Sequence, residues 1–223
     1  MGTVTLSKQN RLFWLGRYSE RVYTTIQVML QQYDRLIDSE GMDYAAFCRN
    51  MGVPCPYDNG EDFCRRYLFD SANPNSVRSS VDALLGNGMV LRETISTPTL
   101  AYLQMAQSAM ELAAKSESPG VELQWVLDDI MAFRGSFDDS VEQETTRNIT
   151  KSGTSVERIS LILRLNWQQS RLEREMRVML NRLYKTDLPV DQEALELISS
   201  CAMGGDAVDR LALLRSVEGL FLV

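Results

Sequence analysis

The 223-residue sequence contains no histidine. This absence excludes Ser-His and Cys-His nucleophile pairs in their usual form, imidazole general bases, and the Glu-x-x-His ligands of helical di-iron proteins. Any chemistry would have to use carboxylates, Lys, Arg, Tyr, Cys or groups from a partner. No complete catalytic set is apparent, so we leave open whether the chain is an enzyme and favour a protein that is not one.

Cysteine is also scarce, and the four residues are Cys48, Cys55, Cys64 and Cys201. The first three follow one another at spacings of seven and nine, which matches no close-paired zinc-ligand pattern. In the cytosol such thiols are normally reduced. We therefore expect buried or idle thiols, no metal site and no cofactor.

Membrane and secretory signals are missing as well. No apolar run approaches the length of a spanning helix, and the opening Met-Gly-Thr-Val-Thr-Leu-Ser-Lys lacks a basic segment followed by an apolar core. The net charge of -7 argues against non-specific binding to nucleic acid or to an anionic membrane, both of which need a basic surface. We expect a cytoplasmic protein that binds neither.

The sequence does show helical periodicity. From Lys8 to Asp38 there is no proline, and apolar residues recur at steps of three and four: Leu15, Tyr18, Val22, Ile26, Met29, Tyr33 and Leu36. A second stripe, Phe13, Gly16, Glu20, Tyr23 and Gln27, predicts that this long helix packs on more than one side. We found no alternating stretch long enough for a sheet, so we predict an all-α, single-domain multi-helix bundle over residues 1–223.

Turn residues and caps divide the rest of the chain into further predicted helices. Residues 42–72 are expected to form a less regular excursion that holds short helices over 44–50 and 61–69. The next three expected helices run from the cap Ser76 to about 95, from the cap Thr97 to about 115, and from Ser118-Pro119 to about 133. After a break at Gly135-Ser136, the chain is expected to be helical to 149 and again from 155 to about 184. Two shorter helices are expected to follow, one after Pro189 and one after Gly205. The apolar end, Leu220 to Val223, is expected to dock on the body.

A short motif occurs twice, as Gly16-x-x-x-Glu20-Arg21 and as Gly153-x-x-x-Glu157-Arg158. At helical spacing, each Glu lies on the same face as a Gly, where bare backbone allows another helix to approach closely. We favour a structural interpretation, in which Glu20 pairs with Arg158 and Glu157 with Arg21. Such buried pairs are best known for fixing the register of packed elements.

A binding site is the alternative interpretation of the same residues. Arg17 and Arg21 are four residues apart, and with Arg92 and Arg164 they would suit a carboxylate or phosphate ligand. The simpler expectation is that Arg17 pairs with Glu20 one turn along the helix. Acid and base roles for Glu20 and Glu157 are disfavoured, because neighbouring arginines would lower their pKa values and make them poor proton donors.

The stretch Leu12-Phe-Trp-Leu-Gly-Arg-Tyr-Ser-Glu-Arg21 resembles the opening helix of the bacterial Alpha-E proteins, a helical domain named for its Glu-Arg motif. The typical sequence of that helix in the family is Leu-Tyr-Trp-Leu-Gly-Arg-Tyr-x-Glu-Arg. Two more blocks are similar to the family: Asn73-Pro-Asn-Ser76 through to Arg92-Glu93, and Gly153 to Arg164. The resemblance implies a ligand-binding or structural ion-pair cluster of Arg17, Glu20, Arg21, Asn73, Asn75, Asn87, Arg92, Glu157, Arg158 and Arg164.

Several positions depart from the family pattern. Gln27, Leu85 and Met89 stand where the family has arginines, and the second copy of the motif lacks the aromatic residue and the Arg that precede the first Glu. The sequence thus resembles a divergent member, in which a family binding site would be weakened.

Alpha-E proteins accompany ATP-grasp ligase-like proteins and transglutaminase-like cysteine peptidases, sometimes within one chain. The resemblance therefore implies a non-catalytic accessory or docking partner of an ATP-grasp ligase-like protein, and possibly of such a peptidase, in peptide synthesis or modification. The alternative is an enzyme or ligand-binding protein that uses the Glu-Arg cluster on a carboxylate- or phosphate-bearing peptide. A homo-oligomeric scaffold is a third expectation.

Overall fold

The structure is a computed structural model that describes residues 4–37, 43–204 and 208–222, with side chains placed up to residue 32 in the first range. Within these residues the chain is all-α, with ten α-helices, one 3-10 helix and one isolated β-bridge. The fold class predicted from the periodicity is confirmed. The contacts divide the chain into a terminal unit, residues 1–20 with 141–223, and a central unit, residues 21–140.

Helix α1 (Leu6–Ile37) contributes its first part to the terminal unit and its remainder to the central unit. The terminal unit also contains α7 (Glu144–Leu165), η1 (Gln169–Arg171), α8 (Leu172–Leu183), α9 (Gln192–Ala202) and α10 (Arg210–Gly219). The central unit also contains α2 (Tyr44–Met51), α3 (Gly60–Phe69), α4 (Val77–Val90), α5 (Thr97–Ala113) and α6 (Gly120–Ser140).

Helix α1 is buried on more than one side, as its two stripes predict. Leu15, Val22 and Ile26 of the first stripe are fully buried, and so are Phe13 and Glu20 of the second, at 4% and 2% exposure. A helix with this pattern is held by packing around its circumference rather than along a single apolar face.

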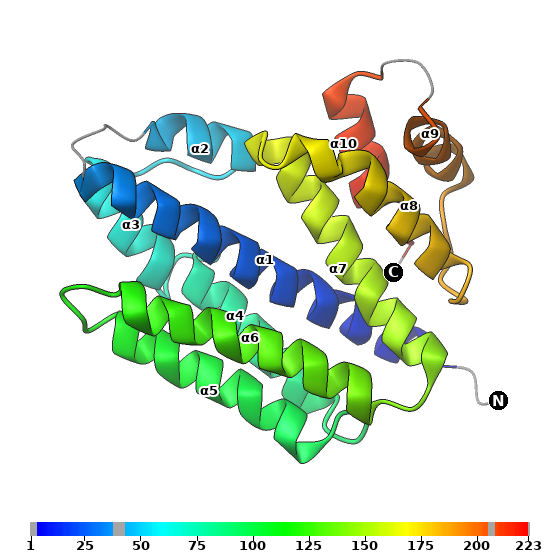
Figure 1. The fold of residues 1–223 in the computed structure, drawn as a ribbon, viewed down its shortest axis with the longest axis horizontal. Helices are drawn as coiled ribbons and strands as arrows, with labels where there is room; N and C mark the ends of the chain where they lie inside the picture. The colour runs from blue at the N-terminus through cyan, green and yellow to red at the C-terminus, as the bar shows by residue number, and fades with distance from the viewer. Residues whose placement is uncertain (1–3, 38–42, 205–207, 223) are drawn as a thin grey trace. The chain divides into compact units, whose positions relative to one another are not determined.

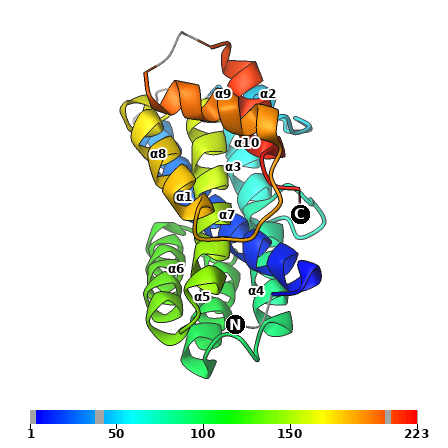
Figure 2. The ribbon, with the colours of Figure 1, turned by 90° about the vertical axis from the view of Figure 1, so that its right-hand side faces the viewer.

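In the terminal unit, α7 is the central helix. Helices α8 and α10 both pack on α7, and α9 packs on α8 and α10 (Figures 1 and 2). The chain ends against this group, because the Leu222 N–H donates to the Pro189 carbonyl and the Asp191 N–H to the Leu220 carbonyl, both at 2.9 Å. Leu220 and Phe221 are buried, as predicted for the apolar end, whereas the Leu222 side chain is exposed and Val223 lies outside the described residues.

In the central unit, α5 and α6 lie side by side, α4 packs on α5, and α3 packs on α4 (Figure 1). Large side chains from these helices are fully buried: Phe63, Leu84, Leu103, Met110, Leu123, Ile130 and Phe133. Helix α5 begins one residue earlier than its Thr-Pro sequence suggests, because the Ser96 hydroxyl caps the Thr99 N–H at 3.3 Å. Helix α4 ends at Val90, before the predicted residue 95.

Three predicted helix boundaries in the second half of the chain are wrong. The expected gap between residues 149 and 155 is absent, because α7 runs without a break from Glu144 to Leu165 and buries Ser152, Gly153 and Ser155 within this stretch. Helix α6 continues through Gly135-Ser136 to Ser140, because Phe133 and Phe137 are both buried and hold that turn in place. The helix expected over 155–184 is interrupted after Leu165. Asn166 and Gln168 there have φ values of 52° and 51°, a left-handed conformation that ends a helix and that Asn tolerates well.

The prediction of a single domain stays a prediction, since the two units share α1 but each has its own cluster of contacts. Among the helices that the structure describes, none has the length and apolar character needed to cross a bilayer. The predicted stop of the first helix at Gly41 lies outside the described residues.

Candidate functional site

The two glycines of the repeated motif mark the point where α1 crosses α7 within the terminal unit. A Cβ atom added to Gly16 would overlap the Thr150 carbonyl, and one added to Gly153 would overlap the Phe13 carbonyl. Phe13 and Thr150 each lie three residues before the glycine of their own helix, so the two contacts are reciprocal. The repeat is therefore a nearly two-fold symmetric crossing, in which each glycine admits the backbone of the other helix.

Two ion pairs join α1 to α7 beside this crossing. Arg158 donates from Nε and Nη2 to the two carboxylate oxygens of Glu20, both at 2.8 Å, in the bidentate arrangement that makes Arg–carboxylate pairs strong. Arg17 Nε donates to Glu157 Oε2 at 2.7 Å. Both carboxylates are buried, with 2% of the Glu20 side chain and 3% of the Glu157 side chain exposed. The predicted pairing of Glu20 with Arg158 is present.

The expectation that Arg17 pairs with Glu20 one turn along α1 is wrong. The Arg17 guanidinium lies over the Trp14 ring, with its carbon 4.7 Å from the ring centroid, and reaches Glu157 on α7 instead. The close approach at the glycines brings Glu157 within range, while Glu20 is occupied by the bidentate contact with Arg158. Arg21 is half-buried, and its predicted pairing with Glu157 stays a prediction.

A third buried carboxylate, Glu175 on α8, belongs to the cluster and was not predicted from the sequence. Its side chain is 4% exposed and accepts from Arg158 Nη1 at 3.1 Å and from Arg171 Nη2 at 3.3 Å. Arg158 therefore bridges two buried carboxylates from different helices. The one sequence signal was the i,i+4 spacing of Arg171 and Glu175, which is common on exposed helix faces and does not mark a buried site.

The charges of this cluster balance within the terminal unit. The carboxylates Glu20, Glu157 and Glu175 are matched by the guanidinium groups of Arg17, Arg158 and Arg171. Burial acts to lower the pKa of Arg158, but the hydrogen bonds and charges of Glu20, followed by those of Glu175, outweigh it and raise that pKa. Buried carboxylates that are each bound to a guanidinium of another helix suit helix packing, because the ion pairs fix how the helices are placed against one another.

Arg164 connects α7 to a different helix. Its Nη2 donates to Glu218 Oε1 at 2.9 Å and to Oε2 at 3.1 Å, which joins α7 to α10. This sequence-predicted site residue thus has an acidic partner within the terminal unit, as do Arg17 and Arg158.

The remaining predicted site residues belong to the central unit. Asn73 Oδ1 accepts from the Asn75 N–H at 3.0 Å, and Asn73 Nδ2 donates to the Tyr57 hydroxyl at 3.2 Å, so these residues shape the turn before α4. Asn87 is buried in α4, and Arg92 is exposed, with its guanidinium 3.5 Å from Glu93. The Asn-Pro-x-Ser block therefore begins a helix here, as Ser76 caps α4 through the Ser79 N–H.

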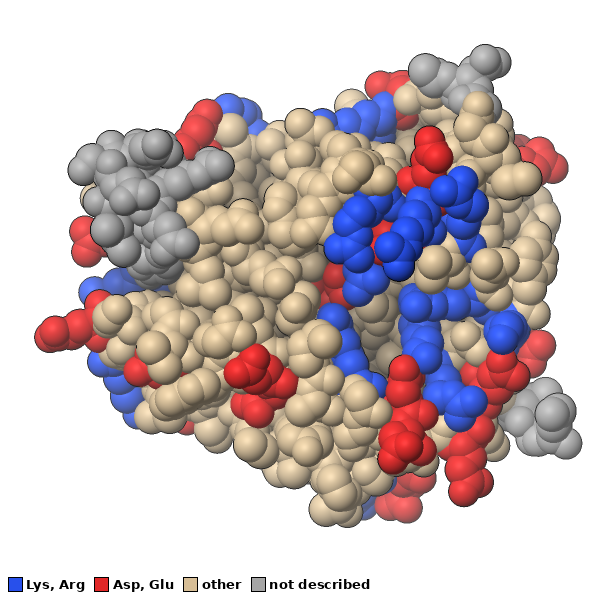
Figure 3. Space-filling view, viewed as in Figure 1, with Lys and Arg blue, Asp and Glu red and all other residues tan. Residues whose placement is uncertain are grey.

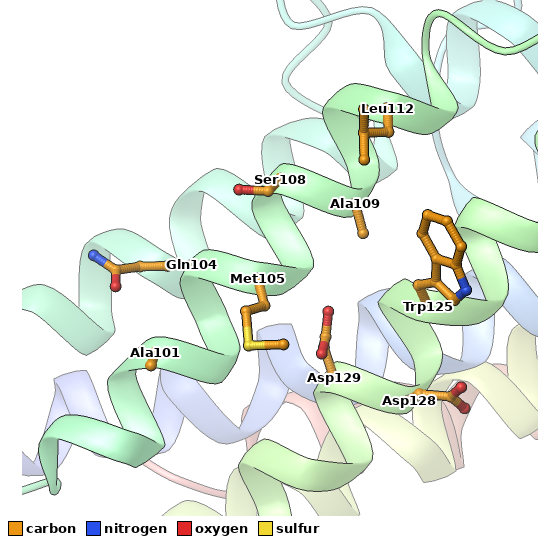
Figure 4. Close-up of a pocket in the computed structure, with 9 residues that line it drawn as sticks. All are labelled: Ala101, Gln104, Met105, Ser108, Ala109, Leu112, Trp125, Asp128 and Asp129. Carbon is orange, nitrogen blue, oxygen red and sulfur yellow. The ribbon is translucent and has the colours of Figure 1, made fainter.

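A groove of about 560 Å³ lies between α5 and α6, entirely within the central unit (Figure 4). It is lined by Ala101, Gln104, Met105, Ser108, Ala109, Leu112, Trp125, Asp128 and Asp129. Burial, followed by the neighbouring charge of Asp128, raises the pKa of Asp129. This groove was not predicted from the sequence. Asp128 and Asp129 follow Trp125 by one helical turn, and this spacing does not show whether another element covers that helix face.

In the described part of the chain, no group of three His, Cys, Asp or Glu side chains is placed so that it could hold a metal ion. Cys48 and Cys64 are buried free thiols, whereas Cys55 is exposed. Burial, aided by a hydrogen bond and the charge of Cys55, raises the pKa of Cys48 to about 12. Burial raises that of Cys64 to about 11. Thiols with such pKa values are poor nucleophiles near neutral pH.

Comparison with known proteins gives one match. The model of the Alpha-E family, described as a predicted alpha-helical domain with a conserved ER motif, matches residues 8–220 and so includes both Glu-Arg copies. No curated protein and no solved structure matches the chain.

Proposed function

Because the chain belongs to the Alpha-E family, we propose that it is a non-catalytic accessory protein that docks on an ATP-grasp ligase-like protein in a system for peptide synthesis or modification. A transglutaminase-like peptidase is a second partner in this proposal. The proposed partner classes are the proteins that accompany Alpha-E members. The docking role is supported by the burial and pairing of the Glu-Arg residues, which leave no open catalytic set among them.

One observation carries the non-catalytic role. The motif that defines the family is used here to hold helices together, because Glu20 and Glu157 are almost completely buried and each accepts from a guanidinium of the other helix. A catalytic carboxylate needs access to substrate, and the burial of these two carboxylates denies it. Function is then left to the outer faces of the helices.

Co-purification with the ATP-grasp ligase-like protein of the same genome tests this proposal. We expect a stoichiometric complex in size-exclusion chromatography with mass detection, at low and at moderate salt. Separate elution at micromolar concentration would contradict it. Glu144→Gln offers a matched surface control, since this exposed carboxylate pairs with Lys185 at 2.8 Å and its loss should leave a docking complex intact.

Binding of an anionic peptide is a second candidate function, favoured by the distribution of charge in the ion-pair cluster. Lys and Arg side chains gather on the face where α7 and α8 lie (Figure 3). The Arg158 and Arg171 side chains are 26% and 45% exposed, while their carboxylate partners are at most 4% exposed. Arg174 is exposed, and its guanidinium has no hydrogen bond or ion pair in the described part of the chain.

A labelled phosphopeptide, titrated into the protein at low salt, tests this second function. Arg174→Gln should weaken binding severalfold without changing the helical circular dichroism, because an exposed Arg without a partner contributes little to the fold. Arg65→Gln, an exposed Arg of α3 in the central unit, is the matched control. Equal binding by wild type and Arg174→Gln would rule out this face.

A further inference from the structure

The groove between α5 and α6 has an apolar rim that stands open to solvent. Met105 and Leu112 on α5 are each 52% exposed, and Trp125 on α6 is 48% exposed. Figure 4 shows Met105 and Trp125 on opposite sides of the same hollow. Large side chains left exposed together along two packed helices are characteristic of a surface that another molecule covers.

Asp129 supplies the polar group of this groove. Its carboxylate points into the space between Met105 and Trp125, whereas Asp128 points away from that space (Figure 4). The Asp129 carboxylate has no hydrogen bond or ion pair in the part of the chain that the structure describes, although the residue is partly buried. A carboxylate in an apolar setting without a cation is unfavourable, and a positively charged group arriving from outside would relieve that cost.

The two helices that form the groove, α5 and α6, carry further negative charge. Residues 97–140 contain seven acidic residues and two basic ones, so this helical pair carries a net charge of -5 out of -7 for the whole chain. The acidic residues are Glu111, Glu117, Glu122, Asp128, Asp129, Asp138 and Asp139. Asp128 and Asp129 line the groove itself, whereas Glu111 is paired with Arg78 of α4. The negative charge at and around the groove favours a cationic partner and disfavours nucleic acid and anionic lipid.

We infer that the groove between α5 and α6 docks a basic amphipathic helix of the partner protein, with apolar side chains between Met105 and Trp125 and a Lys or Arg on Asp129. The inference rests on the proposed docking function and specifies the element that the partner contributes. A helix suits the groove because two packed helices leave a long depression between them, into which the apolar face of a third can lie. Trp125 is the aromatic anchor of this contact, and Asp129 sets its polarity.

Two fluorescently labelled helical peptides test the groove directly: one built of Leu and Lys, the other identical except that Glu replaces each Lys. In fluorescence anisotropy with the intact protein, we expect the Leu/Lys peptide to bind and the Leu/Glu peptide to bind at least tenfold more weakly. Absence of binding by the Leu/Lys peptide, or equal binding of the two peptides, would overturn the inference.

Asp129→Asn is the decisive variant, because it keeps the size of the side chain and removes the charge. We expect it to weaken binding of the Leu/Lys peptide about tenfold, which is the lower range for a contact with a charged group. Asp139→Asn is its matched control, since Asp139 is exposed on the same helix and does not line the groove. Unchanged binding by Asp129→Asn, or equal losses in the two variants, would contradict the inference.

The same variants separate this inference from the proposed function. If the ATP-grasp ligase-like protein forms a complex that Asp129→Asn does not weaken, the docking function stands and the groove inference falls. If that complex never forms while the Leu/Lys peptide still binds in a manner that depends on Asp129, the groove inference stands and the partner class falls.

Discussion

Arg158 is the residue whose removal should best distinguish a structural ion-pair cluster from a binding site. The substitution Arg158→Met keeps much of the aliphatic length of the side chain and deletes the guanidinium. Glu20 then loses two hydrogen bonds of 2.8 Å, and Glu175 loses one of 3.1 Å, while both carboxylates stay buried. We expect the free energy of unfolding to fall by about 3–5 kcal/mol, the usual cost of leaving a buried charge without its partner.

The double variant Glu20→Met with Arg158→Met should recover most of this loss. Replacing both members of a buried pair by apolar side chains of similar volume is often neutral or stabilising. The double variant still removes the hydrogen bond from Arg158 to Glu175, at a cost of about 1 kcal/mol, while Glu175 keeps its contact with Arg171 at 3.3 Å. The coupling between the two sites should therefore be as large as the single-mutant effect.

Urea unfolding followed by circular dichroism measures both quantities. With a slope of roughly 2–3 kcal/mol per M, the Arg158→Met variant should unfold at a urea concentration lower by about 1–2 M, and the double variant near the wild type. Glu20→Met serves as the second single variant of the cycle. A loss below about 1 kcal/mol for Arg158→Met, or a double variant whose loss equals the sum of the singles, would refute the structural role.

Four further predictions follow from particular residues. Gly16→Ala should lower the free energy of unfolding by about 1–3 kcal/mol, because the new Cβ would overlap the backbone of α7. Gly135→Ala should raise it by about 0.5–1 kcal/mol, because nothing lies within 4 Å of the new Cβ. Equal urea midpoints for the two variants would be evidence against the close crossing. Asp129→Asn should raise the melting temperature slightly at pH 7, because it removes the charge that burial disfavours. The folded-state pKa of Asp129 is raised, so ionisation costs stability above the unfolded-state pKa, and the gain should vanish near pH 3; a gain that is the same at both pH values would contradict this reasoning. Thiol titration at pH 8 should label exposed Cys55 quickly and Cys48, with its pKa of about 12, only on unfolding; equal rates would show that Cys48 is accessible. Finally, because α1 runs through both units, circular dichroism and tryptophan fluorescence should report one coincident unfolding transition, whereas two separate transitions would contradict the single-domain prediction.

The helical class and most helix starts could be predicted from local patterns. The apolar steps of three and four identified α1, and the predicted cap Ser76 is the N-cap of α4 in the structure. Helix ends were harder, because they depend on packing. Helix α6 passes through Gly135 where buried phenylalanines hold it, and the break after Leu165 uses left-handed residues that carry no glycine signal.

The candidate site was predictable in part, for the same reason. The paired Gly-x-x-x-Glu-Arg text indicated two close-packed helices and a Glu20–Arg158 pair, since spacing along a helix fixes which side chains share a face. The motif could not predict the pairing of Arg17 with Glu157, because these residues are 140 positions apart. Nor could it identify Glu175 as a third carboxylate, because Arg158 contacts Glu175 across a turn whose path the helical spacing does not determine.

The sequence by itself determined the all-α class, the family and the helix faces that carry the Glu-Arg repeat, because these follow from periodicity and short motifs along one element. Tertiary structure decided which arginine meets which carboxylate, how deeply the cluster is buried, and that a groove with Trp125 and Asp129 stays uncovered. Burial and pairing depend on the distances between separate helices, and a local sequence pattern does not contain those distances.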